Sequence, residues 1–189
     1  IFIGDLKSKK FLKNIGIKIP YVNNLINNAA LANTKFFTKV KRDEIDDLFD
    51  VNLKAIFLLS QIFSKKMISK KIKGNIISIS SQLGHIGAYN RSLYCMTKFG
   101  LEGLNKALAL DLGKYGIRTV TVSPTKTIVD ENEYKKTPKR LKLIKNKTAL
   151  KKFSTKEQIA SIVYFLTKKE SSAITGSSVI VDGGWTAGK

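Results

Sequence analysis

Short apolar runs that alternate with helix-length segments are the feature that most constrains how this chain can fold. Strands and helices in alternation form βαβ units, and these units build a parallel sheet that helices cover on both faces. We therefore predict an α/β fold in which a doubly wound parallel sheet forms three layers, with residues 1–189 as one domain. The expected strands are 1–6 (IFIGDL), 21–30 (YVNNLINNAA), 75–80 (NIISIS), 118–123 (RTVTVS) and 177–184 (SSVIVDGG).

The longer segments between these strands have helical patterns. The expected helices cover about 9–15, 42–71 and 93–114. A further helix is expected to begin at Ser154, because Glu157 three residues later completes the pattern of a capping box.

One polar residue interrupts the apolar stripe of the helix expected at 42–71. Asn52 stands where the register of the stripe would place a leucine, and a buried amide without hydrogen-bond partners is costly. Two interpretations stay open. Asn52 is either a structural residue whose hydrogen bonds are satisfied within the fold, or part of a local helix distortion that holds a water for a proton relay.

The charge of the chain is strongly positive, with 34 Lys and Arg against 14 Asp and Glu and a formal net charge of +20. Such a charge could indicate a nucleic-acid or anionic-membrane partner. Only four of the basic residues are Arg, however, and proteins that read bases and phosphates favour Arg for its bidentate fork. We expect no nucleic-acid partner. A basic nucleic-acid-associated protein stays an alternative, which retention on a polyanion column that falls steeply with salt would reveal.

Cysteine content and hydropathy indicate the compartment. Cys95 is the only cysteine, so no internal disulfide can form and a reducing compartment is the simpler expectation. The longest apolar run, residues 55–63, is far shorter than the roughly 20 residues that cross a bilayer. We expect a cytoplasmic protein with no membrane partner. With one Cys and one His, no metal site is expected.

Three side chains are placed where ligands bind in such a fold, at the carboxyl ends of the parallel strands. Ser81 follows the strand 75–80, Tyr94 comes 13 residues later, and Lys98 lies at i+4 from Tyr94. On a helix, residues at i and i+4 share one face at about 6 Å. A neighbouring ammonium favours the phenolate, so we expect Lys98 to lower the pKa of Tyr94 from about 10.

This set of groups suits the interconversion of a carbonyl and an alcohol. A phenol with a lowered pKa can give a proton to a carbonyl oxygen or take one from an alcohol, and the Ser81 hydroxyl can hold that oxygen. The hydride would come from a nicotinamide cofactor.

The ordered motifs resemble those of the short-chain dehydrogenase/reductase family, from Asp5 to Trp185. The matching stretches are INNAA (26–30) for N-N-A-G, VN (51–52) for its Asn site, ISS…Y…K for its Ser/Tyr/Lys core, SPT (123–125) for S-P-G, and ITGSSVIVDGGW (174–185) for its final strand. The resemblance implies a Rossmann-like fold with strand order 3-2-1-4-5-6-7.

The resemblance also implies catalytic roles. Tyr94 would be the acid/base, Lys98 would lower its pKa and bind the nicotinamide ribose, Ser81 would orient the substrate oxygen, and Asn52 would hold the relay water.

The implied cofactor is NAD or NADP. Besides Tyr94 and Lys98, the family pattern assigns cofactor contacts to Asp5, Leu6, Asn28, Ala29 and Thr127.

The position of His85 and the family resemblance give expectations for the substrate and the partners. His85 follows Ser81 by four residues, so it is either a substrate contact or a solvated loop residue. Residues 125–153 match the variable substrate lid. The resemblance implies a small-molecule alcohol or carbonyl substrate and a homo-oligomer, either a dimer or a homotetramer.

The largest departure from the family is an absence: this sequence has no counterpart of the family's Gly-rich phosphate loop. If 1–6 is the third family strand, two strands precede Ile1 and the chain is the carboxyl-terminal three-quarters of a domain. Strands 1–6 and 21–30 would then lack a neighbour, and we expect residues 1–189 alone to be poorly folded and inactive. The residues that distinguish NAD from NADP would lie in the missing second strand.

The sequence therefore predicts an NAD(P)-dependent oxidoreductase that interconverts an alcohol and a carbonyl, with Tyr94 as acid/base. A catalytically silent binding protein on the same fold is the alternative, since fold does not establish chemistry. The presence of Asn52, Ser81, Tyr94 and Lys98 together favours the enzyme.

Overall fold

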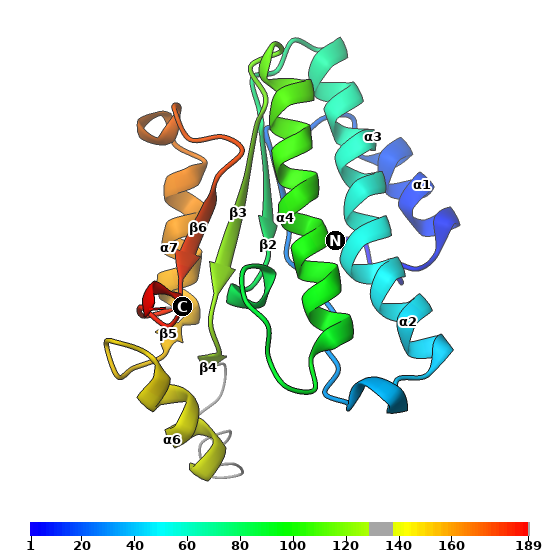
Figure 1. The fold of residues 1–189 in the computed structure, drawn as a ribbon. Helices are drawn as coiled ribbons and strands as arrows, with labels where there is room; N and C mark the ends of the chain where they lie inside the picture. The colour runs from blue at the N-terminus through cyan, green and yellow to red at the C-terminus, as the bar shows by residue number, and fades with distance from the viewer. Residues whose placement is uncertain (129–137, 189) are drawn as a thin grey trace.

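A four-stranded parallel sheet is the centre of the computed structural model, which describes residues 1–128 and 138–188. Its strands lie in the order β1-β2-β3-β6 (Figure 1). They are β1 (Asn24–Asn27), β2 (Asn75–Ile79), β3 (Arg118–Pro124) and β6 (Ser178–Val181). A parallel pair needs a crossover connection, and helices supply it here. The predicted doubly wound α/β fold is confirmed.

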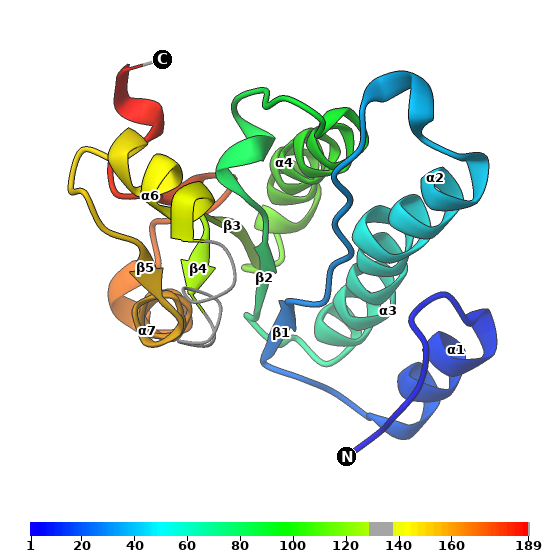
Figure 2. The same cartoon turned by 90° about the horizontal axis from the view of Figure 1, so that it is seen from below.

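Helices cover both faces of this sheet and make the predicted three layers. One face carries α3 (Ala55–Ser69) and α4 (Ser92–Gly113), and the other carries α7 (Lys156–Leu166) (Figure 1). The remaining helices are α1 (Lys9–Lys18), which packs on α3, α2 (Arg42–Phe49), and α6 (Pro138–Lys147) beyond the carboxyl ends of the strands (Figure 2). Two short strands, β4 (Thr127–Ile128) and β5 (Ser154–Thr155), pair with each other.

Two apolar clusters fill the spaces between the layers. Met67, Ile76, Leu112 and Ile117 form one cluster with α3 and α4. Ile77, Val120, Val122 and Leu166 form the second, against α7. Neighbouring residues of β2 thus point to opposite faces, as strand geometry requires. The sheet is held from both sides, and this fixes the ends of the strands where the candidate site lies.

The predicted strand at 1–6 is wrong. Residues 1–5 form no regular element and lead into a turn before α1. Gly4 lies against the Phe11 ring, and the Lys18 ammonium is 5.7 Å from the centroid of the Phe2 ring. A β-strand exists only where a partner accepts its backbone hydrogen bonds, and within residues 1–128 and 138–188 no strand lies beside this run.

The helix predicted at 42–71 is present but interrupted. A π-helical turn, Asp50–Lys54, joins α2 to α3, and such turns often occur at functional sites. The local distortion that Asn52 suggested is therefore present.

The predicted cap of α7 is displaced by one residue. Thr155, not Ser154, is the N-cap, and its hydroxyl accepts a hydrogen bond from the backbone N–H of Gln158 at 3.2 Å. The Gln158 side chain in turn accepts from the Thr155 N–H at 3.0 Å. Ser154 instead donates its hydroxyl to the Val181 carbonyl at 3.1 Å.

In the part of the chain that the structure describes, no helix combines the length and the apolar character that crossing a membrane requires.

Candidate active site

A cleft of about 540 Å³ opens at the carboxyl ends of the strands. Ser81 and Tyr94 line it together with Thr125, Thr127 and Trp185, and α6 contributes Leu143 and Ile144. Ligands of doubly wound folds bind in this position. The structure thus brings three predicted site residues, Ser81, Tyr94 and Thr127, from separate segments to one cavity.

Ser81 reaches the cleft because β2 ends just before it. The residue is the N-cap of a 3₁₀ turn, Gln82–Gly84, and its hydroxyl accepts a hydrogen bond from the Leu83 N–H at 3.1 Å. The same hydroxyl acts on the phenol of Tyr94, whose pKa it lowers. Ser81 and Tyr94 therefore line the same cleft, and their catalytic roles stay predictions.

Lys98 lies one turn after Tyr94 on α4 and is only 1% exposed. Its ammonium is 5.6 Å from the centroid of the Tyr94 ring and donates a hydrogen bond to the Ile79 carbonyl at 2.8 Å. Burial lowers the pKa of Lys98 to about 8, and the charge of Glu102 opposes this decrease. A buried ammonium is rare without a function.

The pKa of Tyr94 differs from the prediction. Burial raises it above the ordinary value, and this effect outweighs the Ser81 hydrogen bond and the Arg91 charge, which both lower it. The expectation that Lys98 lowers it is wrong, because desolvation is the dominant effect on both groups. At neutral pH Tyr94 is therefore a neutral phenol, which can donate a proton.

Asn52 is fully buried, and its side chain is fully hydrogen-bonded. Its amide oxygen accepts from the Leu31 N–H at 2.8 Å, and its amide nitrogen donates to the Leu31 carbonyl at 2.9 Å and to Thr97 Oγ1 at 3.1 Å. Thr97 in turn donates to the Tyr94 carbonyl at 2.9 Å. Asn52 is thus a satisfied structural residue that ties the segment after β1 to the helix of Tyr94. The relay water stays a prediction.

The candidate cofactor residues fall into two groups. Asn28 and Ala29 follow β1 and are exposed, and Thr127 lines the cleft. Asp5 and Leu6 lie instead just before α1, where Asp5 accepts a hydrogen bond from the Lys7 N–H at 2.9 Å. Figure 2 shows this blue segment beside α1, away from β3 and β6. All five cofactor contacts stay predictions.

Two buried polar atoms of the cleft suit a polar ligand. Thr125 Oγ1 and Gln82 Oε1 are buried, and neither has a hydrogen-bond partner among the described residues. Leaving such atoms unpaired costs about 1–3 kcal/mol each. A ligand with amide or hydroxyl groups would satisfy them, and this fits the nicotinamide end of the implied cofactor.

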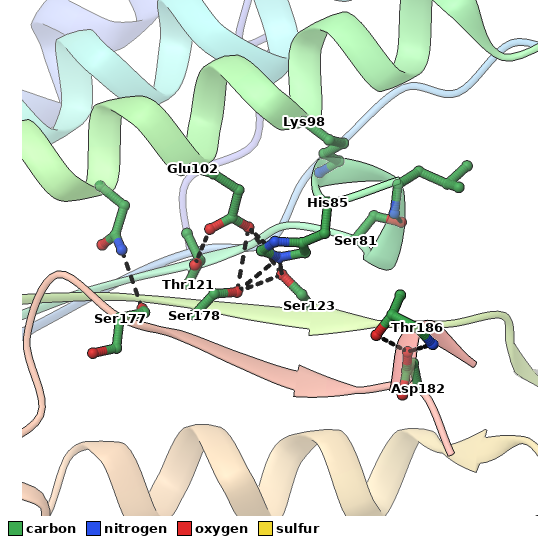
Figure 3. Close-up of polar contacts among 12 residues, drawn as sticks. Ser81, His85, Lys98, Glu102, Thr121, Ser123, Ser177, Ser178, Asp182 and Thr186 are labelled. Atoms are coloured by element: carbon green, nitrogen blue, oxygen red, sulfur yellow. Dashed lines mark hydrogen bonds and ion pairs between the residues drawn. The ribbon is translucent and has the colours of Figure 1, made fainter. Parts of the chain in front are cut away.

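His85 does not line the cleft. Its Nε2 atom lies 3.2 Å from Ser123 Oγ and 3.1 Å from Ser178 Oγ, between α4 and the strands β3 and β6 (Figure 3). The predicted substrate contact stays untested, and this placement weighs against it. The alternative, a solvated loop residue, does not describe these contacts either.

Sequence reasoning missed Asp182, which shapes one wall of the cleft. Its carboxylate accepts hydrogen bonds from the Gly184 N–H at 2.8 Å and from both the N–H and the hydroxyl of Thr186 at 2.7 Å (Figure 3). Burial alone would raise the pKa of Asp182, but these bonds hold it below its ordinary value. The turn that they order carries Trp185. An Asp before two glycines in the sequence was the available signal.

Within residues 1–128 and 138–188, no three His, Cys, Asp or Glu side chains converge as a metal site.

The fold and the cleft define a class: a Rossmann-like α/β protein with a Ser, a Tyr and a Lys at the carboxyl ends of its strands. A family model described as enoyl-(acyl carrier protein) reductase matches residues 5–186. The chain belongs to the short-chain dehydrogenase/reductase family.

Individual relatives agree with this assignment. D-erythrulose reductase of Gallus gallus is 35% identical over 162 residues, which is 85% of this chain and 66% of that protein. L-xylulose reductase of Homo sapiens is 35% identical over 167 residues, 88% of this chain and 68% of that protein. The chain spans about two thirds of the length of these relatives.

Solved structures match the fold. A 4-hydroxyisoleucine dehydrogenase complexed with NADH has a TM-score of 0.92 at 31% identity, covering 98% of this chain and 79% of that one. An NAD(P)-dependent gluconate 5-dehydrogenase of Beutenbergia cavernae, described as putative and with bound NADP, has a TM-score of 0.89 at 26% identity, covering 98% and 76%. NAD and NADP both occur among the neighbours.

Proposed function

We propose that this chain is the substrate- and nicotinamide-binding part of an NAD(P)-dependent oxidoreductase that interconverts an alcohol and a carbonyl. The observation that carries the proposal is that Ser81 and Tyr94 line one cleft, with the buried ammonium of Lys98 5.6 Å from the centroid of the Tyr94 ring. The relatives are named reductases and dehydrogenases, which supports the same reaction type.

The proposed mechanism uses the protonation states of these groups. A bound nicotinamide supplies or accepts the hydride. In the direction of reduction, the Ser81 hydroxyl holds the carbonyl oxygen and the neutral Tyr94 phenol donates the proton to it. Lys98 keeps two N–H groups beyond its bond to Ile79, and these would hold the hydroxyls of the nicotinamide ribose.

The rest of the cofactor site follows from the same placement. Asn28 and Ala29 would lie along the cofactor, and Thr127 with the unpaired Thr125 hydroxyl would contact the carboxamide. Asn52 keeps the segment after β1 in register with α4, so that both sides of the site move together.

The substrate that we propose is a small hydroxylated carbonyl compound. D-erythrulose reductase and L-xylulose reductase are named for such compounds. The cleft offers polar groups, Ser81, Gln82 and Thr125, opposite the apolar Leu143 of α6. We propose that 125–153 is the lid over this substrate, which the position of α6 supports; residues 129–137 lie outside the described part of the chain.

Loss of absorbance of the reduced nicotinamide tests the proposal directly in the complete gene product that contains residues 1–189. D-erythrulose and L-xylulose are the substrates, and a 3-oxoacyl thioester is the comparison. We expect turnover with at least one ketose and none without a carbonyl compound. Tight NADH or NADPH binding without turnover of any of these carbonyls would instead favour the catalytically silent alternative.

We also propose a homo-oligomer, a dimer or a homotetramer, in the cytoplasm. An open apolar groove of about 600 Å³ lies between α2, α3 and α4 and is lined by Phe49, Leu53, Phe57 and Leu104. Apolar surface of this kind is commonly an interface. Light scattering of the wild type and of Phe57→Glu tests this: we expect the variant to be smaller, and equal masses would contradict it.

A further inference from the structure

Glu102 is a buried carboxylate one helical turn beyond Lys98 (Figure 3). Its side chain is 9% exposed. Thr121 donates its hydroxyl to Oε2 at 2.7 Å, and Ser123 donates its hydroxyl to Oε1 at 2.9 Å. Burying a carboxylate is costly unless it is paired and hydrogen-bonded, so the hydroxyls of β3 form a specific site for this charge.

His85 completes this site from the loop that follows Ser81. Its Nε2 atom lies 3.4 Å from Glu102 Oε1 and within 3.2 Å of the Ser123 and Ser178 hydroxyl oxygens. Those two hydroxyls are 2.9 Å apart. If Ser178 donates to Ser123 and Ser123 donates to Glu102, both protons are used, and Nε2 faces only acceptors. In that arrangement the hydrogen of the His85 ring at this face lies on Nε2.

The composition of this cluster resembles a Ser-His-Glu hydrolytic triad, but its geometry does not. In a triad the carboxylate and the serine contact opposite ring nitrogens, whereas here Glu102, Ser123 and Ser178 all face Nε2. Ser123 is also fully buried. The arrangement is therefore not that of a hydrolytic triad.

The loop between Ser81 and His85 is pressed closely onto α4. A Cβ atom at Gly84 would lie 3.1 Å from both Glu102 Cγ and the Lys98 carbonyl oxygen. The loop therefore meets α4 at the turn that carries Lys98. His85, the residue after Gly84, contacts Glu102, so the loop packs on α4 through both residues.

We propose that Glu102 is a positioning residue: through His85 it fixes the Ser81 loop to α4, and it sets a buried carboxylate one helical turn from the Lys98 ammonium. This inference rests on the proposed function, because it assigns a role toward two residues of that site. We call the contact of His85 with Glu102 the clasp. It holds the Ser81 loop against α4, and Ser81 and Tyr94 face each other across this interface between loop and helix.

The electrostatics of Lys98 agree with this role. Burial lowers the pKa of Lys98 to about 8, and Glu102 is the group that raises it. The other ionisable groups nearby are Tyr94, Arg91 and Cys95 on α4 and His85 of the loop. Among the described residues, the adjacent strands contribute the Ile79 carbonyl from β2 and hydroxyls from β3 and β6.

The test compares isosteric variants of the complete gene product. Glu102→Gln removes the charge, and Asp111→Asn, at an exposed position of the same helix, is the matched control. His85→Gln keeps an N–H donor at the clasp, whereas His85→Leu removes it. The readouts are the pH profile of kcat, the KM for the carbonyl, and amide hydrogen exchange of residues 82–87 without substrate.

For Glu102→Gln we expect the alkaline limb of the kcat profile to move to lower pH. Losing a nearby opposite charge commonly lowers a lysine pKa by up to about one unit, so kcat near pH 8 should fall about two- to fivefold. KM should change less than about twofold, and Asp111→Asn should match the wild type. For His85→Leu we expect exchange of the loop about tenfold faster and a lower kcat, with both restored toward the wild type in His85→Gln.

Superimposable pH profiles for Glu102→Gln and Asp111→Asn would overturn the role toward Lys98. Unchanged loop exchange in His85→Leu would overturn the clasp. If the wild type itself shows no turnover, the proposed function fails, and the exchange experiment still decides whether the clasp exists.

Discussion

Replacing Lys98 with Met should stabilise the protein while it abolishes turnover. Each tenfold change in proton affinity corresponds to about 1.4 kcal/mol. Lowering the pKa of Lys98 from 10.5 to about 8 therefore means that burying its charged form costs about 3 kcal/mol at neutral pH. Met has a similar length and no charge, but it loses the hydrogen bond to Ile79, worth about 1 kcal/mol. The expected net gain is about 2 kcal/mol at pH 7.

The sign of this effect depends on pH in a defined window. In the unfolded chain Lys98 stays protonated up to about pH 10.5, whereas in the fold it loses its proton near pH 8. The unfolded state therefore binds more protons between these values, and the stability of the wild type rises with pH there. The advantage of Lys98→Met is complete below about pH 8 and disappears as the pH approaches 10.5.

Thermal unfolding of the complete gene product, followed by circular dichroism at pH 7 and pH 10, measures both effects. We expect the variant to melt about 4–8 °C higher at pH 7, to be no more stable at pH 10, and to lose turnover at least about a hundredfold. A variant that is less stable at pH 7, or whose advantage does not change with pH, would refute the account of Lys98 as a buried charge kept for function.

Three further outcomes follow from the site. Asn52→Ala removes three hydrogen bonds and should lower the free energy of unfolding by about 3 kcal/mol. The control Asn105→Ala loses one described bond and should lower it by about 1 kcal/mol. Equal losses in urea unfolding would contradict this. Gly84→Ala should lower kcat about tenfold, because the added Cβ meets α4. Gly103→Ala, which has open space at its Cβ, should leave kcat unchanged. Equal kcat values for the two variants would argue against close packing of the Gly84 loop on α4. Residues 1–189 expressed alone should show no NAD(P)H-dependent turnover, because the chain lacks a Gly-rich phosphate loop; measurable turnover would show that this loop is dispensable.

Local spacing made much of the candidate site predictable. Ser81 follows a strand, and Tyr94 and Lys98 share a helix face, so their approach depends on short stretches of sequence. Asn52 was equally visible, since a polar residue in an apolar stripe implies either a partner or a distortion, and the structure has both.

The remaining features depend on contacts that are distant in sequence. The apolar run 1–6 has strand-like composition, but strand formation needs a partner that composition does not reveal. The pKa of Tyr94 depends on how deeply the fold buries it. Glu102 and Ser178 lie 76 positions apart, so the cluster that surrounds the clasp, with hydroxyls from β3 and β6, appears only in three dimensions.

The kinetics of Tyr94→Phe test the central claim most directly. In the complete gene product we expect NADH or NADPH to bind within a few-fold of the wild type, because the ring stays in place. Reduction of the carbonyl should fall about a thousandfold or more, because the proton donor is gone. A Tyr94→Phe protein that keeps a tenth or more of the wild-type turnover would contradict the assignment of Tyr94 as the acid/base.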